Sequence, residues 1–219
     1  MSLNLLYRIF TSAILLIILC LGLFLNKYLW LCLLILASGI SYYEFYKLIQ
    51  KKFKKKKNKI FLSNIISIIY LINFTYAGYA LYENSHINLI FVLLICIFSD
   101  TGGYIVGKSI GGKKLTKISP KKTISGSVGS LIFSIFPIII FSLIYDNFFI
   151  SEWLYFYILT CLFLSLICQF GDLFISYFKR QAKVKDTGSL LPGHGGLLDR
   201  IDGIIFVLPT AYILDKIIL

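Results

Sequence analysis

Seven long stretches of apolar residues follow one another along the chain, separated by short polar segments. They run roughly over residues 9–25, 28–46, 60–82, 87–107, 125–145, 153–175 and 203–219. Each has roughly 17–23 residues, the length that an α-helix needs to cross a hydrocarbon core of about 30 Å. The pattern predicts an all-α integral membrane protein with about seven transmembrane helices. The first stretch lacks a small-residue cleavage site, so we expect a retained span and not a signal peptide.

Composition supports this prediction. Apolar residues make up 58% of the 219 residues, and charged residues only 15%. A soluble chain of this length cannot bury that much apolar surface, because domain size limits the buried fraction. The five cysteines lie inside the apolar stretches without a CxxC pair, and we expect them to pack as small core residues.

The basic residues predict the orientation of the spans. With the N-terminus inside, 20 of the 22 lysines and arginines fall in inner segments, and only Lys27 and Lys216 fall outside. Such a bias is typical of cytoplasmic segments. The inner loop 47–59 is dense in lysine and is expected to determine topology and to contact anionic lipid headgroups. No aromatic platform accompanies it, so we expect no nucleic-acid partner.

The chain is expected to form one polytopic domain with two regions. Residues 1–99 hold N-terminal spans, and residues 100–219 hold the two inner-face loops that carry candidate chemistry. Asp100 precedes Lys108 by eight residues and Asp172 precedes Lys179 by seven, so on helices they lie about 12 Å and 10 Å back from these lysines. A carboxylate in that apolar zone needs a cation or hydrogen bonds, which makes both residues functional candidates. A purely structural pairing with a nearby lysine is the alternative.

The third inner loop, residues 179–200, adds carboxylates, bases and glycines. Asp199 and Asp202 are three residues apart and share one helix face, where their charges repel unless a cation or base lies between them. Oxygen-only ligands favour Mg²⁺ over zinc. The glycines beside His194 let backbone amides approach an anion, although His194 itself is equally typical of a turn. Positive charge comes from Lys179, Arg180, Lys185 and Arg200.

The second inner loop, residues 108–122, alternates glycines with lysines and ends in Ser119-Pro120-Lys121-Lys122-Thr123. Such a loop can close over a polyphosphate, with lysines, hydroxyls and amides as donors. Carboxylates for Mg²⁺, basic side chains and exposed amides are together what phosphoryl or nucleotidyl transfer requires.

These residues resemble the signature of the phosphatidate cytidylyltransferase (CDP-diacylglycerol synthase) family. The resemblance lies in Ser176, Lys179-Arg180, Lys185-Asp186, Gly188, Pro192, His194-Gly195-Gly196, Asp199-Arg200 and Asp202. Asp100-Thr101-Gly102 and the segment 119–123 resemble a second block of that family, so the likeness covers roughly the C-terminal 120 residues. Two features depart from it: the N-terminal half is short, and Ser125 stands where many members carry an acidic residue.

The resemblance implies that CTP and phosphatidate react to give CDP-diacylglycerol and pyrophosphate with Mg²⁺. It implies that Asp172 and Asp199 bind the metal ion and that Asp202 assists them as a further metal ligand. It also implies that Lys179, Arg180 and Ser176 are catalytic. Substrate binding is assigned to Asp100, Lys121, Lys122, Lys185, Asp186, His194, Gly195, Gly196 and Arg200.

The resemblance further implies a multi-pass protein of a bacterial-type inner membrane, with the site facing the cytoplasm, a homodimer, and a second, monovalent cation. Two alternatives stay open. One is a CTP-dependent polyprenol kinase or related lipid cytidylyltransferase. The other is an ion-coupled transporter, which would place its carboxylates nearer the bilayer midplane.

Overall fold

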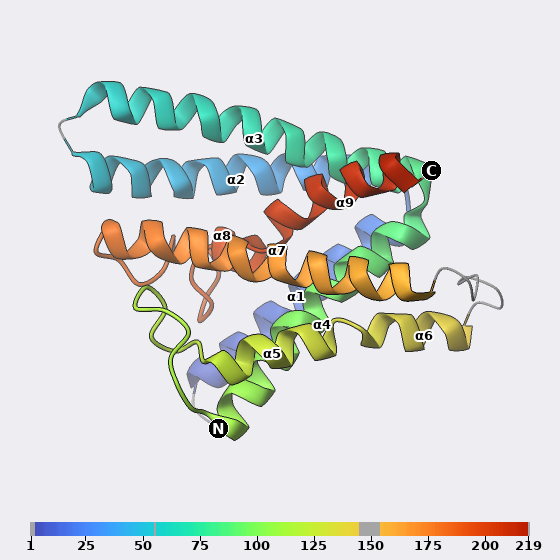
Figure 1. Cartoon of the computed structure of the whole chain (residues 1–219). Helices are drawn as coiled ribbons and strands as arrows, with labels where there is room; N and C mark the ends of the chain where they lie inside the picture. Colours follow the sequence, from blue (N-terminus) through green and yellow to red (C-terminus); the bar gives the residue numbers. More distant parts are fainter. Residues whose placement is uncertain (1–2, 55, 145–153, 219) are drawn as a thin grey trace.

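The computed structural model describes residues 3–54, 56–144 and 154–218, and in these ranges the chain is helical apart from its connections, of which 111–123 and 182–197 are the long ones. The helices are shown in Figure 1. They are α1 (Leu3–Phe24), α2 (Lys27–Phe53), α3 (Lys57–Asn84), α4 (His86–Ile110), α5 (Ile124–Phe133), α6 (Phe136–Ile144), α7 (Leu154–Gln181), α8 (Leu198–Ile201) and α9 (Ile204–Ile218).

Five segments are long and apolar enough to cross a membrane: α2, α3, α4, the pair α5–α6 taken together, and α7. The prediction of an all-α, multi-pass membrane protein is therefore confirmed. Helix α1 is apolar over the shorter stretch Ile9–Phe24, and α9 has 15 residues. The number of seven spans stays a prediction, and residues 145 and 153, where two predicted spans end and begin, lie outside the described residues.

The predicted inner loop 47–59 is wrong in its extent, because most of it is helical. Helix α2 continues to Phe53 and α3 begins at Lys57. Lysine is a good helix former, and Lys52 gains further contacts, since its Nζ lies 4.2 Å from the centroid of the Phe178 ring. Helix α7 likewise continues through Lys179 and Arg180, which shortens the third inner loop.

The predicted span 125–145 is interrupted after Phe133. Pro137 has no N–H to donate to the carbonyl four residues earlier, and its ring collides with that carbonyl, so a straight helix cannot continue. The chain responds with a break between α5 and α6. This difference from the predicted continuous span follows from Pro137, because the hydrophobic pattern counts proline as apolar and ignores its effect on the backbone.

Helices α4 and α5 pack very closely through glycines. A Cβ atom on Gly126 of α5 would lie 2.8 Å from the carbonyl oxygen of Gly103 in α4, so a larger residue would push the helices apart. The connection between these helices, residues 111–123, is called the glycine-lysine loop below. The close packing returns this loop toward α7.

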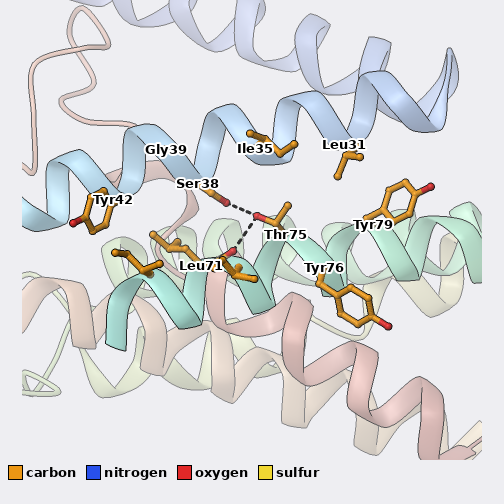
Figure 2. A pocket seen from close by; sticks show the side chains of 11 residues that line it. Leu31, Ile35, Ser38, Gly39, Tyr42, Leu71, Thr75, Tyr76 and Tyr79 are labelled. Carbon is orange, nitrogen blue, oxygen red and sulfur yellow. Dashed lines mark hydrogen bonds between the residues drawn. The ribbon is translucent and has the colours of Figure 1, made fainter. Parts of the chain in front are cut away.

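Helices α2 and α3 form an antiparallel pair with an open groove of about 510 Å³ between them (Figure 2). Its polar groups are already bonded, since the Ser38 and Thr75 hydroxyls are 2.7 Å apart and Thr75 donates to the Leu71 carbonyl. None of the predicted site residues lines this groove, so it is not the candidate site.

The segments predicted to face inward lie at one end of the bundle. In Figure 1 the α2–α3 connection, the glycine-lysine loop and the loop after α7 are all at the left, whereas the C-terminus is at the right. The loop after α7, residues 182–197, is called the signature loop below. The side of the membrane on which this end lies stays a prediction.

Candidate active site

Three carboxylates from different segments approach one another. Asp100 comes from α4, Asp172 from α7, and Asp202 follows α8. Burial raises the pKa of Asp202 well above its usual range, and the neighbouring charges of Asp172 and Asp100 raise it further. We call these three residues the carboxylate cluster. Of the predicted site residues, the structure thus brings Asp172 and Asp202 together with Asp100.

The glycine-lysine loop reaches this cluster through Lys122. Its Nζ forms an ion pair with Asp172 Oδ2 at 2.5 Å, and Ser176 donates to the other carboxylate oxygen of Asp172 at 3.1 Å. Arg180 Nε donates to the carbonyl of Ile118 at 3.2 Å, which ties the middle of the loop to α7. The two predicted inner-face loops therefore converge on the same end of α7.

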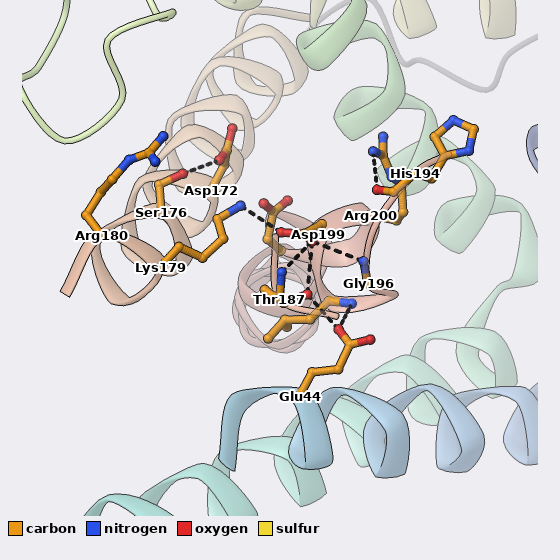
Figure 3. Close-up of polar contacts among 12 residues, drawn as sticks. Glu44, Asp172, Ser176, Lys179, Arg180, Thr187, His194, Gly196, Asp199 and Arg200 are labelled. Carbon is orange, nitrogen blue, oxygen red and sulfur yellow. Dashed lines mark hydrogen bonds and ion pairs between the residues drawn. The ribbon is translucent and has the colours of Figure 1, made fainter. Parts of the chain in front are cut away.

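Asp199 has a different environment, in which protein donors engage both of its oxygens (Figure 3). Lys179 Nζ lies 2.7 Å from Oδ1, and Oδ2 accepts from the Thr187 N–H and the Gly196 N–H at 2.8 and 3.1 Å. Burial favours the neutral acid, but the bond from Lys179 and the backbone donors outweigh it and hold the pKa of Asp199 below its usual range. Asp199 therefore anchors Lys179 and the signature loop.

The remaining predicted residues spread over the signature loop and its neighbours. The His194 imidazole faces α1, where Nδ1 lies 2.5 Å from Thr11 Oγ1, and Arg200 donates to the His194 carbonyl at 2.8 Å. Gly195 has φ +92°, which only glycine adopts without strain. Gly196 is buried, while Lys121, Lys185 and Asp186 are exposed on their loops.

Sequence reasoning missed Glu44. This carboxylate on α2 is only 4% exposed, and it accepts hydrogen bonds from the Leu197 and Leu198 amides and the Thr187 hydroxyl (Figure 3). A signal was present, because Glu44 is the only charged residue in the apolar stretch 28–46. An isolated carboxylate in a span is a functional candidate by default.

An apolar cavity of about 310 Å³ lies next to these residues, between α2, α3, α7 and α9. Ile175 and Leu198 line it, and they are the direct neighbours of Ser176 and Asp199 in the chain. Apolar space therefore adjoins the polar site.

The fit of a metal ion rests on the donor chemistry. Within residues 3–54, 56–144 and 154–218, no three His, Cys, Asp or Glu side chains lie close enough together to hold a metal ion. The carboxylate cluster nevertheless offers only oxygen donors, and the like charges raise the pKa of Asp202. An oxygen-only set with excess negative charge suits a hard divalent cation, so Mg²⁺ stays the predicted ion for these residues.

Comparisons with known proteins agree with this chemistry. Over 153 residues the chain is 44% identical to a phosphatidate cytidylyltransferase of Staphylococcus saprophyticus, covering 68% of this chain and 57% of the relative. A protein of the same name from Rickettsia bellii is 40% identical over 60% of both chains. One from Bacillus subtilis is 44% identical over 57% of this chain and 46% of its own length.

The chain thus spans about half the length of these relatives. The model of the cytidylyltransferase family matches residues 61–218, which include the carboxylate cluster, the glycine-lysine loop and the signature loop. Because this match covers more than half of the chain, the protein belongs to the cytidylyltransferase family.

Proposed function

We propose that the protein transfers the cytidylyl group of CTP to phosphatidate, giving CDP-diacylglycerol and pyrophosphate. The observation that carries this proposal is the ion pair between Lys122 and Asp172, which joins a loop suited to polyphosphates to the carboxylate cluster. The names of the three relatives give the same substrate class for those proteins.

The phosphate of phosphatidate is already an anion near neutral pH, so it attacks the α-phosphorus of CTP without a strong general base. The new P–O bond forms as the bond to the departing pyrophosphate breaks. Lys122, Lys179, Arg180 and Arg200 offset the repulsion between the two anions. Asp172 and Asp202, with Asp100 beside them, would hold Mg²⁺. When bound, Mg²⁺ supplies charge stabilisation for the pentavalent transition state and the pyrophosphate.

The predicted role of Asp199 as a metal ligand stays a prediction, and in this proposal Asp199 orients a basic side chain. Its carboxylate holds Lys179 at 2.7 Å, so the ammonium group keeps one orientation toward the phosphates. Ser176 holds Asp172 in the same manner. The predicted catalytic residues thus divide into two kinds. Some contact the substrates or Mg²⁺, and others orient those contacting side chains.

The apolar cavity supports a lipid substrate. Because Ile175 and Leu198 line it beside Ser176 and Asp199, an acyl chain there leaves its phosphate close to the polar site. We further propose that this end of the bundle faces the cytoplasm of a bacterial-type membrane, where CTP is available. The homodimer and the second, monovalent cation stay predictions.

The test is an assay of purified protein in detergent with labelled CTP, phosphatidate and Mg²⁺. A labelled lipid and pyrophosphate are expected, and a polyprenol in place of phosphatidate should give no product. Excess chelator should abolish the reaction, Mg²⁺ should restore it, and zinc at equal concentration should not. Phosphorylation of the polyprenol without CDP-diacylglycerol would assign the protein to the kinase alternative.

A further inference from the structure

Glu44 has an unusual set of partners for a carboxylate on a transmembrane helix. Oε2 accepts from the Thr187 hydroxyl at 2.7 Å and from the Leu198 N–H at 2.9 Å, and Oε1 accepts from the Leu197 N–H at 3.0 Å. Within the described ranges Glu44 forms no ion pair. Its partners instead all come from the signature loop and the first residue of α8.

Two glycines of the signature loop pack directly on this carboxylate. A Cβ atom on Gly188 would lie 2.6 Å from Glu44 Oε1, and one on Gly196 would collide with the other oxygen. The loop therefore lies so close to Glu44 that any residue larger than glycine at positions 188 and 196 would collide with its carboxylate. Glu44 occupies the centre of the loop and is not a peripheral contact.

Thr187 connects Glu44 to the predicted catalytic residues. Its hydroxyl lies 2.7 Å from Glu44 Oε2 and 3.0 Å from Asp199 Oδ2, and its N–H also donates to Asp199. Asp199 in turn binds Lys179. A continuous series of contacts thus runs from α2 through Thr187 and Asp199 to the lysine on α7.

We propose that Glu44 is a positioning residue of the active site, which holds the signature loop so that Asp199 orients Lys179. Glu44 acts through Thr187 and the amides of Leu197 and Leu198 and does not itself meet a substrate. It lies outside residues 61–218, which the family model covers, so the inference assigns an active-site role to the N-terminal region. Its kinetic part depends on the proposed cytidylyl transfer.

The kinetic test compares Glu44→Gln with wild type. Glutamine keeps the length of the side chain but has a single acceptor oxygen, and its NH₂ group faces N–H or O–H donors. We expect kcat to fall at least about 30-fold, with KM for CTP and phosphatidate changed less than about threefold. Glu83→Gln is the matched control, because Glu83 pairs with Lys27 at the other end of the α2–α3 pair. It should keep kcat within about threefold of wild type.

A second readout does not depend on activity. Hydrogen–deuterium exchange of the purified proteins should be at least about tenfold faster in residues 186–198 of Glu44→Gln, and unchanged in α3. If Glu44→Gln does not fold, Thr187→Val removes the connecting hydroxyl while keeping the shape. It should give the same local increase in exchange and the same fall in kcat.

The outcomes separate the two proposals. Faster exchange in the signature loop together with an inactive wild type would reject cytidylyl transfer and keep the positioning role. Unchanged exchange and kcat in Glu44→Gln would overturn that role. A raised KM at constant kcat would also overturn it, because Glu44 would then bind substrate. Faster exchange in every helix would show a general loss of stability and would overturn it as well.

Discussion

Lys122 and Asp172 form an ion pair in which Nζ lies 2.5 Å from Oδ2, and both side chains are less than one third exposed. The pair joins the glycine-lysine loop to α7, where Ser176 donates to the other oxygen of Asp172. A phosphate that enters this space meets the lysine and the carboxylate cluster at once. The pair therefore ties the glycine-lysine loop to the carboxylate cluster.

Replacement of Lys122 by glutamine should lower cytidylyl transfer by at least about a hundredfold, equivalent to about 2.7 kcal/mol. The variant loses the charge that offsets the phosphates and leaves Asp172 without its cation. Lys117→Gln, an exposed lysine of the same loop, serves as the control and should stay within a few-fold of wild type. Equal rates for the two variants would contradict a role of Lys122 in the reaction.

Asp202→Asn should give a more stable but inactive protein. Burial and two like charges disfavour the ionised carboxylate of Asp202 and raise its pKa, so folding at neutral pH must either bury this charge or protonate it; the amide avoids both costs and the melting temperature should rise. Turnover should fall at least about a thousandfold, on the order of 4 kcal/mol. Asp172→Asn should lose as much activity, and the double variant should be scarcely worse than either single one. A stable Asp202→Asn protein with the wild-type rate would refute the metal assignment.

Asp199→Asn should lower the melting temperature, in contrast to Asp202→Asn. The Asp199 carboxylate accepts from Lys179 and two backbone N–H groups, and both members of the ion pair are mostly buried. Removal of one partner of such a pair costs about 3 kcal/mol, so the melting temperature should fall while turnover is also lost. A melting temperature above that of wild type would show that Asp199 is instead an uncompensated charge.

The lysines around the α2–α3 connection should affect topology and not chemistry. A variant with glutamine at four of them should keep turnover within a few-fold once it is correctly inserted, because none of the four contacts the carboxylate cluster. The four are Lys54, Lys56, Lys57 and Lys59. Turnover of the purified, inserted protein is the measurement, and a loss above about a hundredfold, roughly 2.7 kcal/mol, would reveal substrate binding by this segment.

Much of the fold follows from the sequence because helix length in a membrane is set by apolar length. The stretches 28–46, 60–82 and 87–107 all became helices, and each extends beyond its apolar limits. The extension through Lys51 and Lys52 was not predicted, since the pattern treats charge as the end of a span. The break before Pro137 is not predicted either, because the hydrophobic pattern treats an uninterrupted apolar run as one continuous helix.

The sequence predicts some residues of the candidate site but not the environment of others. Asp100 and Asp172 stood out because a carboxylate in an apolar stretch needs compensation, and the same argument applied to Glu44 but was not made. The separate environment of Asp199 could not be derived from spacing. Asp199 and Asp202 do share a helical segment, but the return of the signature loop decides which donors reach each of them.

The contact between Glu44 and the Leu198 amide spans 154 residues of chain. At a synthesis rate of about 5–20 residues per second, Glu44 leaves the ribosome about 8–30 s before its donor exists. During that interval the carboxylate has none of its final partners, and a bare charge within the bilayer is costly. We therefore expect helix α2 to reach its final depth after the signature loop has been made, so that the C-terminal region completes the membrane insertion of the N-terminal one.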